Sequence, residues 1–360
     1  MALITDTHFG DRSDNQHLLA HQQRFFRETF FPILEKKSVE HVIHLGDLVD
    51  RRKFMNFLVQ KAMNECFLDP LQALGIPVDI LVGNHDTPYR HTNDGHALNL
   101  LLAAYPRFRI WDKPGHIQLG SRSVFMLPWI PEDKDTRTKI LAQTKRSKAP
   151  TCLGHLDIAS FINNDGDDAK GIDMEHLAHF DDVYTGHFHT RQNRDNISYL
   201  GSPYQSTWSD HGQPKGFHVW DTDTGDITFI RNPHSMFNVV EYNDSMMTPK
   251  DHHKMVDKLN VANTFVKVLV EHKDDSMGCD NFLTHILDIG VCDLKVIDTT
   301  IFARVDEDID YAAEDTLAIL KKVVHDYDHG GVDKDKLENF VVWAWNKAVY
   351  MREVDAGSTD

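Results

Sequence analysis

The chain has 360 residues, which is long enough for two domains or for one large domain with appendages. Its 41% hydrophobic and 26% charged residues are typical of a globular protein rather than of a disordered or fibrous one. A net charge of -17 argues against a general nucleic-acid coat protein, but it does not exclude a protein that acts on nucleic acid, because bound metal ions add positive charge that side-chain counts omit.

The cysteines and the lengths of the apolar runs indicate in which cellular compartment the protein works. None of the four cysteines, Cys66, Cys152, Cys279 and Cys292, has zinc-site or CxxC spacing, which indicates a reducing compartment. The few residues ahead of Asp6 are needed as a strand, so we expect no secretory signal. No apolar run approaches the length of a membrane span. We therefore expect a cytoplasmic protein, in the host bacterial cytoplasm if a phage encodes it.

The first part of the chain alternates predicted strands and helices. Apolar runs at residues 2–5, 41–45 and 77–82 predict buried strands. Residues 15–37 and 53–74 have apolar side chains at helical spacing, and we expect Pro32 and Pro70 to kink or end these helices. Gly75 is the expected C-cap of the second helix, and residues 95–104 predict a third. This alternation is typical of a mainly parallel α/β layer fold.

Shorter elements follow up to residue 233. The predicted strands are 108–111, 117–119, 124–127, 151–153 and 182–185, with a helix at 136–147 and a hairpin of 217–221 with 226–230. Residues 158–170 are polar and turn-rich, and we interpret them as a solvated loop because EF-hand spacing is absent. The turn that begins at Gly201 is either a plain turn or a backbone approach to phosphate, and both interpretations stay open.

Beyond residue 233 the pattern changes. Residues 264–271, 279–288 and 292–299 predict strand, helix and strand of a small separate domain. Helices are then expected at 312–325 and 333–351. The last one has a broad apolar surface, which includes Leu337, Phe340, Val341, Trp343, Ala344 and Trp345. This helix either packs on the protein's own core or binds a partner protein.

Five polar motifs directly follow predicted strands. They are Asp6-Thr7-His8, Gly46-Asp47, Gly83-Asn84-His85-Asp86, Gly154-His155 and Gly186-His187-Phe188-His189. Side chains at strand ends converge on one rim of an α/β sheet. Imidazole nitrogens with Asp and Asn oxygens suit Mn, Fe or Zn better than Ca or Mg, and manganese is our first expectation. Two such ions about 3.5 to 4 Å apart, bridged by Asp47, would clamp the oxygens of a phosphate ester. The motifs therefore predict a two-metal phosphoesterase.

The order of these motifs resembles that of calcineurin-like metallophosphoesterases. More narrowly, the chain is similar to SbcD-type DNA-repair nucleases that work with an SMC-like ATPase, including the recombination endonuclease subunits of T-even-like phages. The resemblance rests on Asp47-Leu48-Val49-Asp50-Arg51, Gly83 to Thr87, Pro128-Trp129, Cys152 to His155, Gly186 to His189 and Tyr199 to Pro203. These motifs lie within residues 1–233.

The resemblance implies roles for individual residues. It places one metal on Asp6, His8, Asp47 and His189, and the second on Asp47, Asn84, His155 and His187. His85 would act near the leaving oxygen as an acid or as a transition-state stabiliser. Asp86 would orient the His85 ring. Asp50, Arg51 and Ser202 are the expected DNA contacts, although Asp50 stands where some relatives have histidine.

The resemblance also implies an architecture. It predicts an α/β sandwich of mixed sheets flanked by helices at residues 1–233, a small α+β domain at 234–303 that caps DNA, and a helical tail at 304–360 that binds a coiled-coil ATPase. A homodimer through helices near residues 54–74 and 95–104 is expected.

The function implied is a DNA nuclease subunit that acts in recombination, repair and replication. It would degrade double-stranded ends in the 3′ to 5′ direction and cut single strands internally. The alternative is a small-molecule phosphodiesterase or a protein phosphatase on the same core. The material after residue 233 favours the nuclease, because a stand-alone phosphatase has little use for it. A scaffold with a vestigial site is disfavoured, because every ligand is present.

Overall fold

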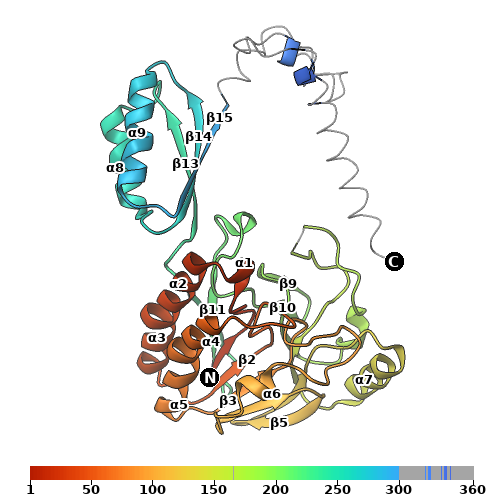
Figure 1. Cartoon of the computed structure of the whole chain (residues 1–360). Helices are drawn as coiled ribbons and strands as arrows, with labels where there is room; N and C mark the ends of the chain where they lie inside the picture. The colour runs from red at the N-terminus through yellow and green to blue at the C-terminus, as the bar shows by residue number, and fades with distance from the viewer. Residues whose placement is uncertain are drawn as a thin grey trace. The chain divides into compact units, whose positions relative to one another are not determined.

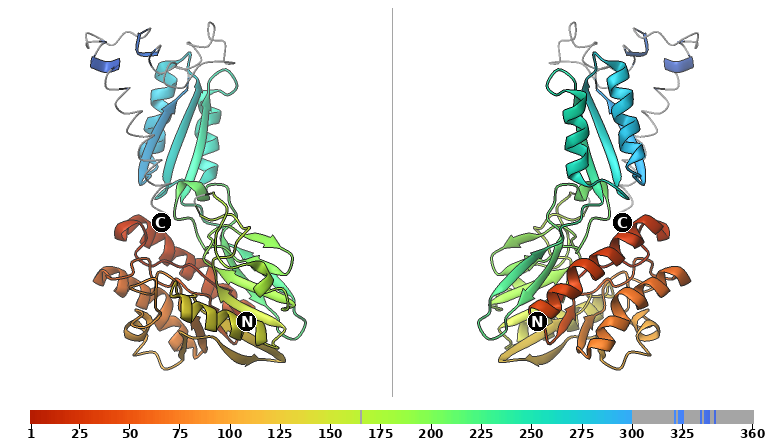
Figure 2. Two further views of the ribbon diagram at one scale, coloured as in Figure 1. Left: turned by 90° about the vertical axis from the view of Figure 1, so that its right-hand side faces the viewer. Right: turned by 90° about the vertical axis from the view of Figure 1, so that its left-hand side faces the viewer.

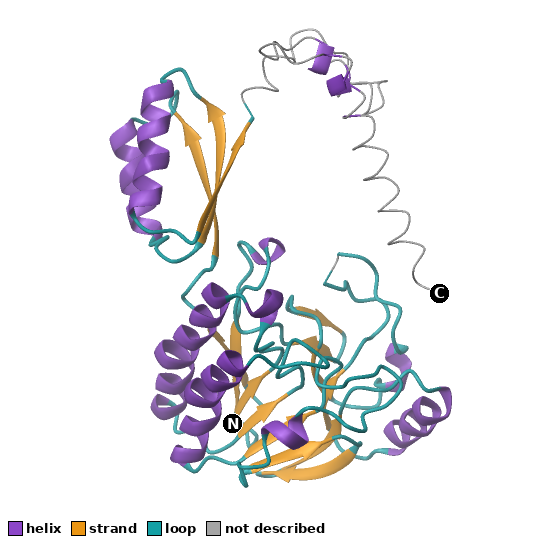
Figure 3. Ribbon diagram, in the orientation of Figure 1, coloured by secondary structure: helices purple, strands orange, loops and turns teal. Residues whose placement is uncertain are grey.

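The computed structural model describes residues 1–164, 166–299, 321, 323–325, 334, 336–338 and 341. Two six-stranded sheets form the centre of the larger part of the chain (Figures 1 and 3). In spatial order, the first sheet contains β12 (Ile227–Arg231), β11 (Gly216–Trp220), β1 (Ala2–Ile4), β2 (Val42–His44), β3 (Val78–Leu81) and β4 (Phe108–Trp111). The second contains β5 (Gly115–Leu119), β6 (Arg122–Leu127), β7 (Thr151–His155), β8 (Asp182–Gly186), β10 (Ile197–Tyr199) and β9 (Gln192–Arg194).

Both sheets are mixed, with a parallel centre and antiparallel edges. In the first sheet β1 to β4 run parallel, while β11 pairs antiparallel with β1 and forms the predicted hairpin with β12. In the second sheet β6, β7, β8 and β10 are parallel, and β5 and β9 pair antiparallel at the edges. Apolar side chains from both sheets share one buried cluster, for example Leu3 and Leu81 with Leu153 and Met126. The predicted sandwich of mixed sheets is confirmed.

Two long helical stretches pack on the other face of the first sheet. They are α2 (Gln16–Phe25), a π-helical segment (Phe26–Phe30) and α3 (Phe31–Lys36), followed later by α4 (Phe57–Met63), a second π-helical segment (Asn64–Leu68) and α5 (Asp69–Leu74). Pro32 and Pro70 were expected to kink or end these helices. The helical stretches do not end there, but a π-helical segment interrupts the α-helix directly before each proline, which lies in the first turn that follows. A wider π turn before a proline accommodates its missing N–H donor. Gly75 has a φ of 70° and ends α5 as predicted.

The remaining helices of this part are short or peripheral. They are α1 (Asp11–Asp14), α6 (Leu98–Leu101), α7 (Lys134–Arg146) and two 3-10 turns, Met174–His176 and Trp208–Asp210. The helix predicted at 95–104 is thus reduced to α6, because Gly95 has a φ of +75° and starts the segment in a non-helical conformation. α7 begins at Lys134, ahead of the predicted start at residue 136, and the Asp133 carboxylate caps it by accepting from the Thr136 N–H.

A three-stranded sheet follows, with β14 between β13 and β15. Its elements are β13 (Phe237–Asn243), α8 (Pro249–Leu259), β14 (Phe265–His272), α9 (Ser276–Asp288) and β15 (Asp293–Asp298). Both helices lie on one face of this sheet (Figure 2). The predicted strand, helix and strand are confirmed, whereas β13 and α8 were not predicted. Pro249 at the start of α8 is the signal that could have identified that helix.

The chain divides into two compact units. One comprises residues 1–240, 253–267 and 283–295, and the other comprises 241–252, 268–282 and the described residues from 296 onward. In the second unit the rings of Tyr242, His252 and Phe282 pack together, with centroids 4.5 to 5.5 Å apart. The helices predicted at 312–325 and 333–351 lie almost wholly outside the described residues. Among the helices that the structure describes, none has the length and apolar character needed to span a bilayer.

Aromatic packing beneath the first sheet gives a test of the fold. Phe26 is fully buried, and its ring lies 4.9 Å from that of Phe67 and 5.7 Å from that of Phe9. We expect Phe26→Ala to lower the free energy of unfolding by about 3 to 5 kcal/mol, because the ring leaves a cavity that the neighbours fill only partly. Denaturant unfolding measures this. Leu74→Ala, at a side chain that is 55% exposed, is the control and should cost less than about 1 kcal/mol. Equal losses in the two variants would contradict this packing.

Candidate metal centre

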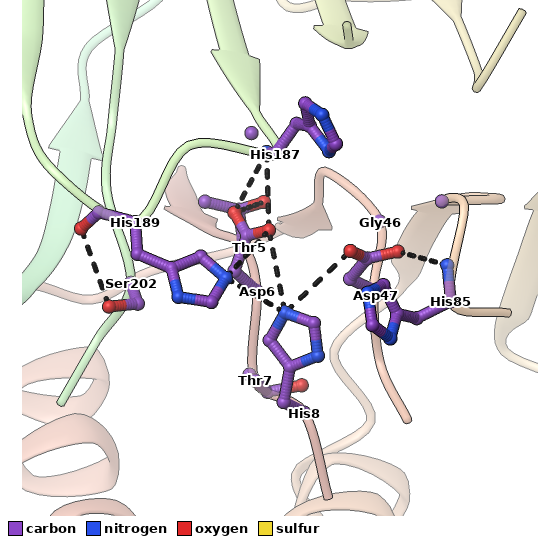
Figure 4. A network of polar contacts seen from close by, with 12 residues as sticks. Thr5, Asp6, Thr7, His8, Gly46, Asp47, His85, His187, His189 and Ser202 are labelled. Atoms are coloured by element: carbon purple, nitrogen blue, oxygen red, sulfur yellow. Dashed lines mark hydrogen bonds and ion pairs between the residues drawn. The ribbon is translucent and has the colours of Figure 1, made fainter. Parts of the chain in front are cut away.

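The seven predicted ligands lie together where strands of the two sheets end. Figure 4 shows Asp6, His8, Asp47, His187 and His189, and Asn84 and His155 contact this set. Asp6 and His8 follow β1, Asp47 follows β2, and His189 follows β8. The His8 Nε2 atom lies 3.8 Å from Asp6 Oδ1, 3.6 Å from Asp47 Oδ2 and 3.0 Å from His189 Nε2. His189 Nε2 also lies 4.0 Å from Asp6 Oδ1. These four side chains form a first group of converging ligand atoms.

A second group adjoins the first through Asp47. The His155 Nε2 atom lies 3.3 Å from Asp47 Oδ2 and 3.0 Å from Asn84 Oδ1. The His187 Nδ1 atom lies 2.9 Å from the same Asn84 oxygen. One oxygen of Asp47 therefore faces a histidine nitrogen of each group, which is the position that a bridging carboxylate would occupy.

The separations between these atoms fit divalent cations. Ligand atoms about 2.1 Å from one ion and at right angles to each other lie about 3 Å apart. The two Nε2 atoms of His8 and His189 have this separation, as do Asn84 Oδ1 and its two histidine nitrogens. Three described groups of side chains could hold an ion: Asp6, His8 and His189; Asp47, His155 and His187; and His8, Asp50 and His85.

Two of the four candidate histidine ligands have a protonation state that suits ligation. Burial lowers the pKa of His187 to about 3 and that of His189 to about 4, so both rings are neutral near pH 7. A neutral imidazole keeps the lone pair that a metal ion needs. Despite burial, nearby carboxylates raise the pKa of the other two, that of His155 to about 9 and that of His8 well above its ordinary value, so these two rings would release a proton on ligation. Burial opposes ionisation of Asp47, but positive charge on His155 and His85 holds the pKa of Asp47 well below its ordinary value.

Ligand residues occupy unusual backbone conformations. Four of them have positive φ angles: Asp6 (53°), His8 (41°), Asp47 (56°) and His187 (92°). Each such conformation costs a non-glycine residue about 1 to 3 kcal/mol, and such residues cluster at functional sites. Close approach of the loops needs glycine: a Cβ atom on Gly83 would lie 2.2 Å from Asp47 Oδ1, and one on Gly186 would lie 2.0 Å from Thr5 Oγ1.

The Asp86 carboxylate holds two of the ligand loops together. It accepts hydrogen bonds from the backbone N–H groups of Asp47, Leu48 and Val49 at 3.0, 3.0 and 3.3 Å, and from that of Gly83 at 2.8 Å. Burial and the negative charge of Asp47 raise the pKa of Asp86 to about 7, and its hydrogen bonds to backbone N–H groups oppose that rise. Asp86 is thus a support for the loops that carry Asp47 and Asn84.

The structure differs from the expectation that Asp86 orients the His85 ring. His85 Nδ1 instead lies 2.6 Å from the backbone carbonyl oxygen of Asp50, which accepts the Nδ1 proton and leaves Nε2 available. The backbone N–H of His85 donates to Asp47 Oδ1 at 2.8 Å. The His85 side chain is 34% exposed, unlike the buried ligands around it. His85 is therefore positioned by the Asp47 loop and open to solvent.

The three expected DNA contacts have different surroundings. The Asp50 carboxylate lies 3.5 Å from His8 Nδ1, and Arg51 pairs with Asp14 at 3.3 Å. Ser202 is only 2% exposed, and its hydroxyl donates to the Tyr204 carbonyl at 3.1 Å. The Ser202 N–H and hydroxyl also reach the His189 carbonyl (Figure 4). Ser202 therefore supports the His189 loop and is buried away from a large substrate.

Other supports of that loop were not predicted. Lys215 Nζ donates to the His189 carbonyl at 2.7 Å and pairs with Asp210 at 2.6 Å, with both side chains buried. Asn164 accepts from the His189 N–H at 2.7 Å and donates to the His187 carbonyl at 3.2 Å. Asn164 lies in the segment that we interpreted as a solvated loop. A lone lysine or asparagine in the sequence gives no signal of such a role.

Comparison with known proteins places the chain in a family. Residues 1–224 match the calcineurin-like phosphoesterase family, and the chain belongs to it. The chain is similar to exonuclease subunit 1 of Enterobacteria phage T4, with 27% identity over 274 residues, which are 76% of this chain and 77% of that protein.

Two further relatives are more distant or shorter in their overlap. The DNA double-strand break repair protein Mre11 of Sulfurisphaera tokodaii is 28% identical over 52% of this chain and 48% of that protein. The SbcD component of the nuclease SbcCD of Staphylococcus epidermidis is 24% identical over 62% of this chain and 67% of that protein. The predicted family and its reaction class, metal-dependent hydrolysis of phosphodiesters, are confirmed.

The role of Asp86 as a loop support can be tested by metal binding. We expect Asp86→Ala to weaken binding of Mn²⁺ about 10- to 100-fold although Asp86 is not a ligand, because four backbone N–H groups lose their acceptor. Titration calorimetry on the folded protein measures this affinity. Asp79→Ala is the matched control. Asp79 lies on β3 and is buried like Asp86, but its carboxylate accepts from the Arg109 and Trp111 side chains and not from loop N–H groups. Wild-type affinity in Asp86→Ala would contradict the assignment.

Proposed function

We propose that this protein is the nuclease subunit of a nuclease and ATPase complex that acts in DNA recombination, repair and replication. It would degrade double-stranded DNA from 3′ ends and cut single-stranded DNA internally. The observation that carries the proposal is the pair of ligand groups that share Asp47 next to the solvent-exposed ring of His85. The names of the relatives, an exonuclease subunit, a break-repair protein and a component of a nuclease, support DNA as the substrate.

The site fits two divalent ions per chain, and Mn²⁺ is our proposal for both. Asp6, His8, Asp47 and His189 would hold one ion, and Asp47, Asn84, His155 and His187 the other. When bound, the ions would supply Lewis acidity to the scissile phosphate and to water. Mixed nitrogen and oxygen donors favour manganese, iron or zinc over calcium and magnesium.

His85 is the proposed catalytic residue. The Asp50 carbonyl fixes a proton on Nδ1, so that Nε2 is left to hold a second proton. A ring in this state can donate a hydrogen bond to a phosphate oxygen or a proton to the leaving oxygen. The Asp47 carboxylate accepts the His85 N–H and thereby sets the ring beside the metal centre.

The extent of similarity favours a nuclease over a phosphatase. The alignment with the phage T4 relative covers 274 residues, more than the 224 residues matched by the phosphoesterase family. The relative therefore shares material outside the catalytic core. We propose residues 1–233 as that core, 234–303 as a capping domain for DNA and 304–360 as a helical tail. A small-molecule phosphodiesterase or a protein phosphatase on this core remains the alternative.

Exposed apolar side chains support the proposed homodimer. Phe57 and Leu100 are each 85% exposed, Phe54 is 73% exposed, and Leu58 is 61% exposed. Phe54 and Leu100 also line a cavity of about 420 Å³ together with Arg51 and other residues. Large apolar side chains gathered on one surface are typical of a protein interface. These residues lie in or near the helices at 54–74 and 95–104 for which we propose the dimer contact.

The proposed ATPase partner involves the tail. An SMC-like coiled-coil ATPase would bind the apolar surface that contains Leu337, Phe340, Val341, Trp343, Ala344 and Trp345. Of these residues, the structure describes Leu337 and Val341 only. The proposal therefore rests on the apolar pattern of the sequence and on the named nuclease relatives.

Two single substitutions distinguish the role of His85 from that of Asp47. We expect His85→Ala to keep both metal ions but to cut DNA about 10² to 10⁴ times more slowly, because it removes a catalytic group and no ligand. Asp47→Ala should lose metal as well as activity. Metal content by elemental analysis and single-turnover cleavage measure the two effects. Loss of both ions in His85→Ala would make His85 a ligand and end this assignment.

The substrate is tested by comparing three phosphoesters under Mn²⁺. We expect cleavage of linear double-stranded DNA and of circular single-stranded DNA, and little turnover of 4-nitrophenyl phosphate. Binding to DNA should weaken as salt rises, because phosphate contacts release counterions. Efficient turnover of the phosphomonoester without cleavage of either DNA would favour the phosphatase alternative instead.

A further inference from the structure

A second cavity adjoins the metal centre within residues 1–240. Its volume is about 620 Å³, and its lining includes Arg12, His189, Thr190, Gln192, Ser209 and Gln213. Sites for small ligands commonly have about 300 to 1,000 Å³. His189 is the residue that the cavity shares with the seven candidate ligands, so a molecule in it would lie next to the metal centre without occupying it. No step of the proposed reaction uses this space.

Several lining side chains of the cavity are uncharged and polar, and they hydrogen-bond to one another or to nearby backbone. Thr190 Oγ1 donates to Gln213 Oε1 at 3.0 Å, and Gln213 Nε2 donates to the Ser209 carbonyl at 2.8 Å. Gln192 accepts from the Ile162 N–H at 2.9 Å and donates to its carbonyl at 2.6 Å. Amide and hydroxyl groups each offer both donors and acceptors. A wall of this kind suits the edge of a nucleobase, which also has both donors and acceptors.

The cavity lining also includes one positively charged side chain, that of Arg12. Arg12 is exposed, whereas the other ionic lining side chain, Asp210, is buried and paired with Lys215 at 2.6 Å. Arg12 has no carboxylate partner among the described residues. It lies in a segment where Arg12, Ser13 and Asp14 all have positive φ angles, and Asp14 is held by Arg51. In a chain with a net charge of -17, a guanidinium group presented in this way is suited to a phosphate group.

We propose that this cavity binds one unpaired nucleotide next to the scissile phosphate, with its base against Ser209 and Gln213 and a flanking phosphate on Arg12. The inference rests on the proposed nuclease function and names a subsite of it. A base that is stacked inside a duplex cannot enter a recess in the protein, so the nucleotide must leave the stack. Unstacking is easiest in single strands and at frayed ends. The subsite therefore favours these positions over the interior of a duplex.

Abasic substitution tests the base contact. The full-length protein with Mn²⁺ is given single-stranded oligonucleotides that carry one tetrahydrofuran residue on either side of the cleaved bond. On one side, the missing base should lower kcat/KM of the wild type about tenfold, the effect of one or two lost hydrogen bonds. Gln213→Leu should reduce that penalty to less than twofold. No penalty on either side, or an undiminished penalty in Gln213→Leu, would overturn the proposal.

Removing the charge of Arg12 tests the phosphate contact. Comparing two substrates with the same variant keeps this test independent of any loss of folded protein. Arg12→Gln should raise KM for the oligonucleotide about tenfold more than KM for bis(4-nitrophenyl) phosphate, which has no base or flanking phosphate. Arg146→Gln, at an exposed arginine in the last turn of α7, is the matched control. Equal effects of the two substitutions would remove Arg12 from the subsite. A wild-type protein that hydrolyses the small diester and leaves all DNA uncut would overturn the nuclease function itself.

Discussion

The metal centre depends on two loops, and the Asp86 carboxylate holds these loops next to each other. Its four hydrogen bonds to backbone N–H groups tie the loop after β2 to the loop after β3. The first loop provides Asp47, the candidate bridge, and the second provides Asn84 and His85. Gly83 allows the two to approach within a distance that no side chain would permit. The strained backbone at Asp47 persists because this network holds it in place.

Electrostatics explains how an acidic protein can act on an anionic substrate. The net charge of -17 disfavours general binding to DNA, and the buried carboxylates Asp6 and Asp47 add to the negative charge at the site. Two divalent ions would reverse the local sign, so that affinity for phosphate would be concentrated at this centre. Arg12 adds positive charge at the adjoining cavity. Recognition in this arrangement is local and depends on metal.

Features that depend on neighbouring residues in the chain could be predicted from the sequence. Buried strands followed by Asp, His or Asn predicted the sheet pattern and the meeting of these side chains, because parallel strands end at a common rim. The choice of seven candidate ligands among them came from the family resemblance. Prediction failed where tertiary contacts decide. Asp86 was assigned to His85 from the family resemblance, yet its partners include Asp47, Leu48 and Val49. Lys215 and Asn164 support His189 across long sequence separations. An interruption was predicted at Pro32 and Pro70, but its form, a π-helical segment before each proline, has no local signal in the sequence.

We propose that Asp47 bridges two metal ions in one centre. Electron paramagnetic resonance of the Mn²⁺-loaded protein, combined with elemental analysis of the same sample, tests it most directly. The account predicts two manganese ions per chain with a spectrum of an exchange-coupled pair, and loss of the coupling in Asp47→Ala. One manganese ion per chain with an isolated six-line spectrum and full cleavage of DNA would contradict it.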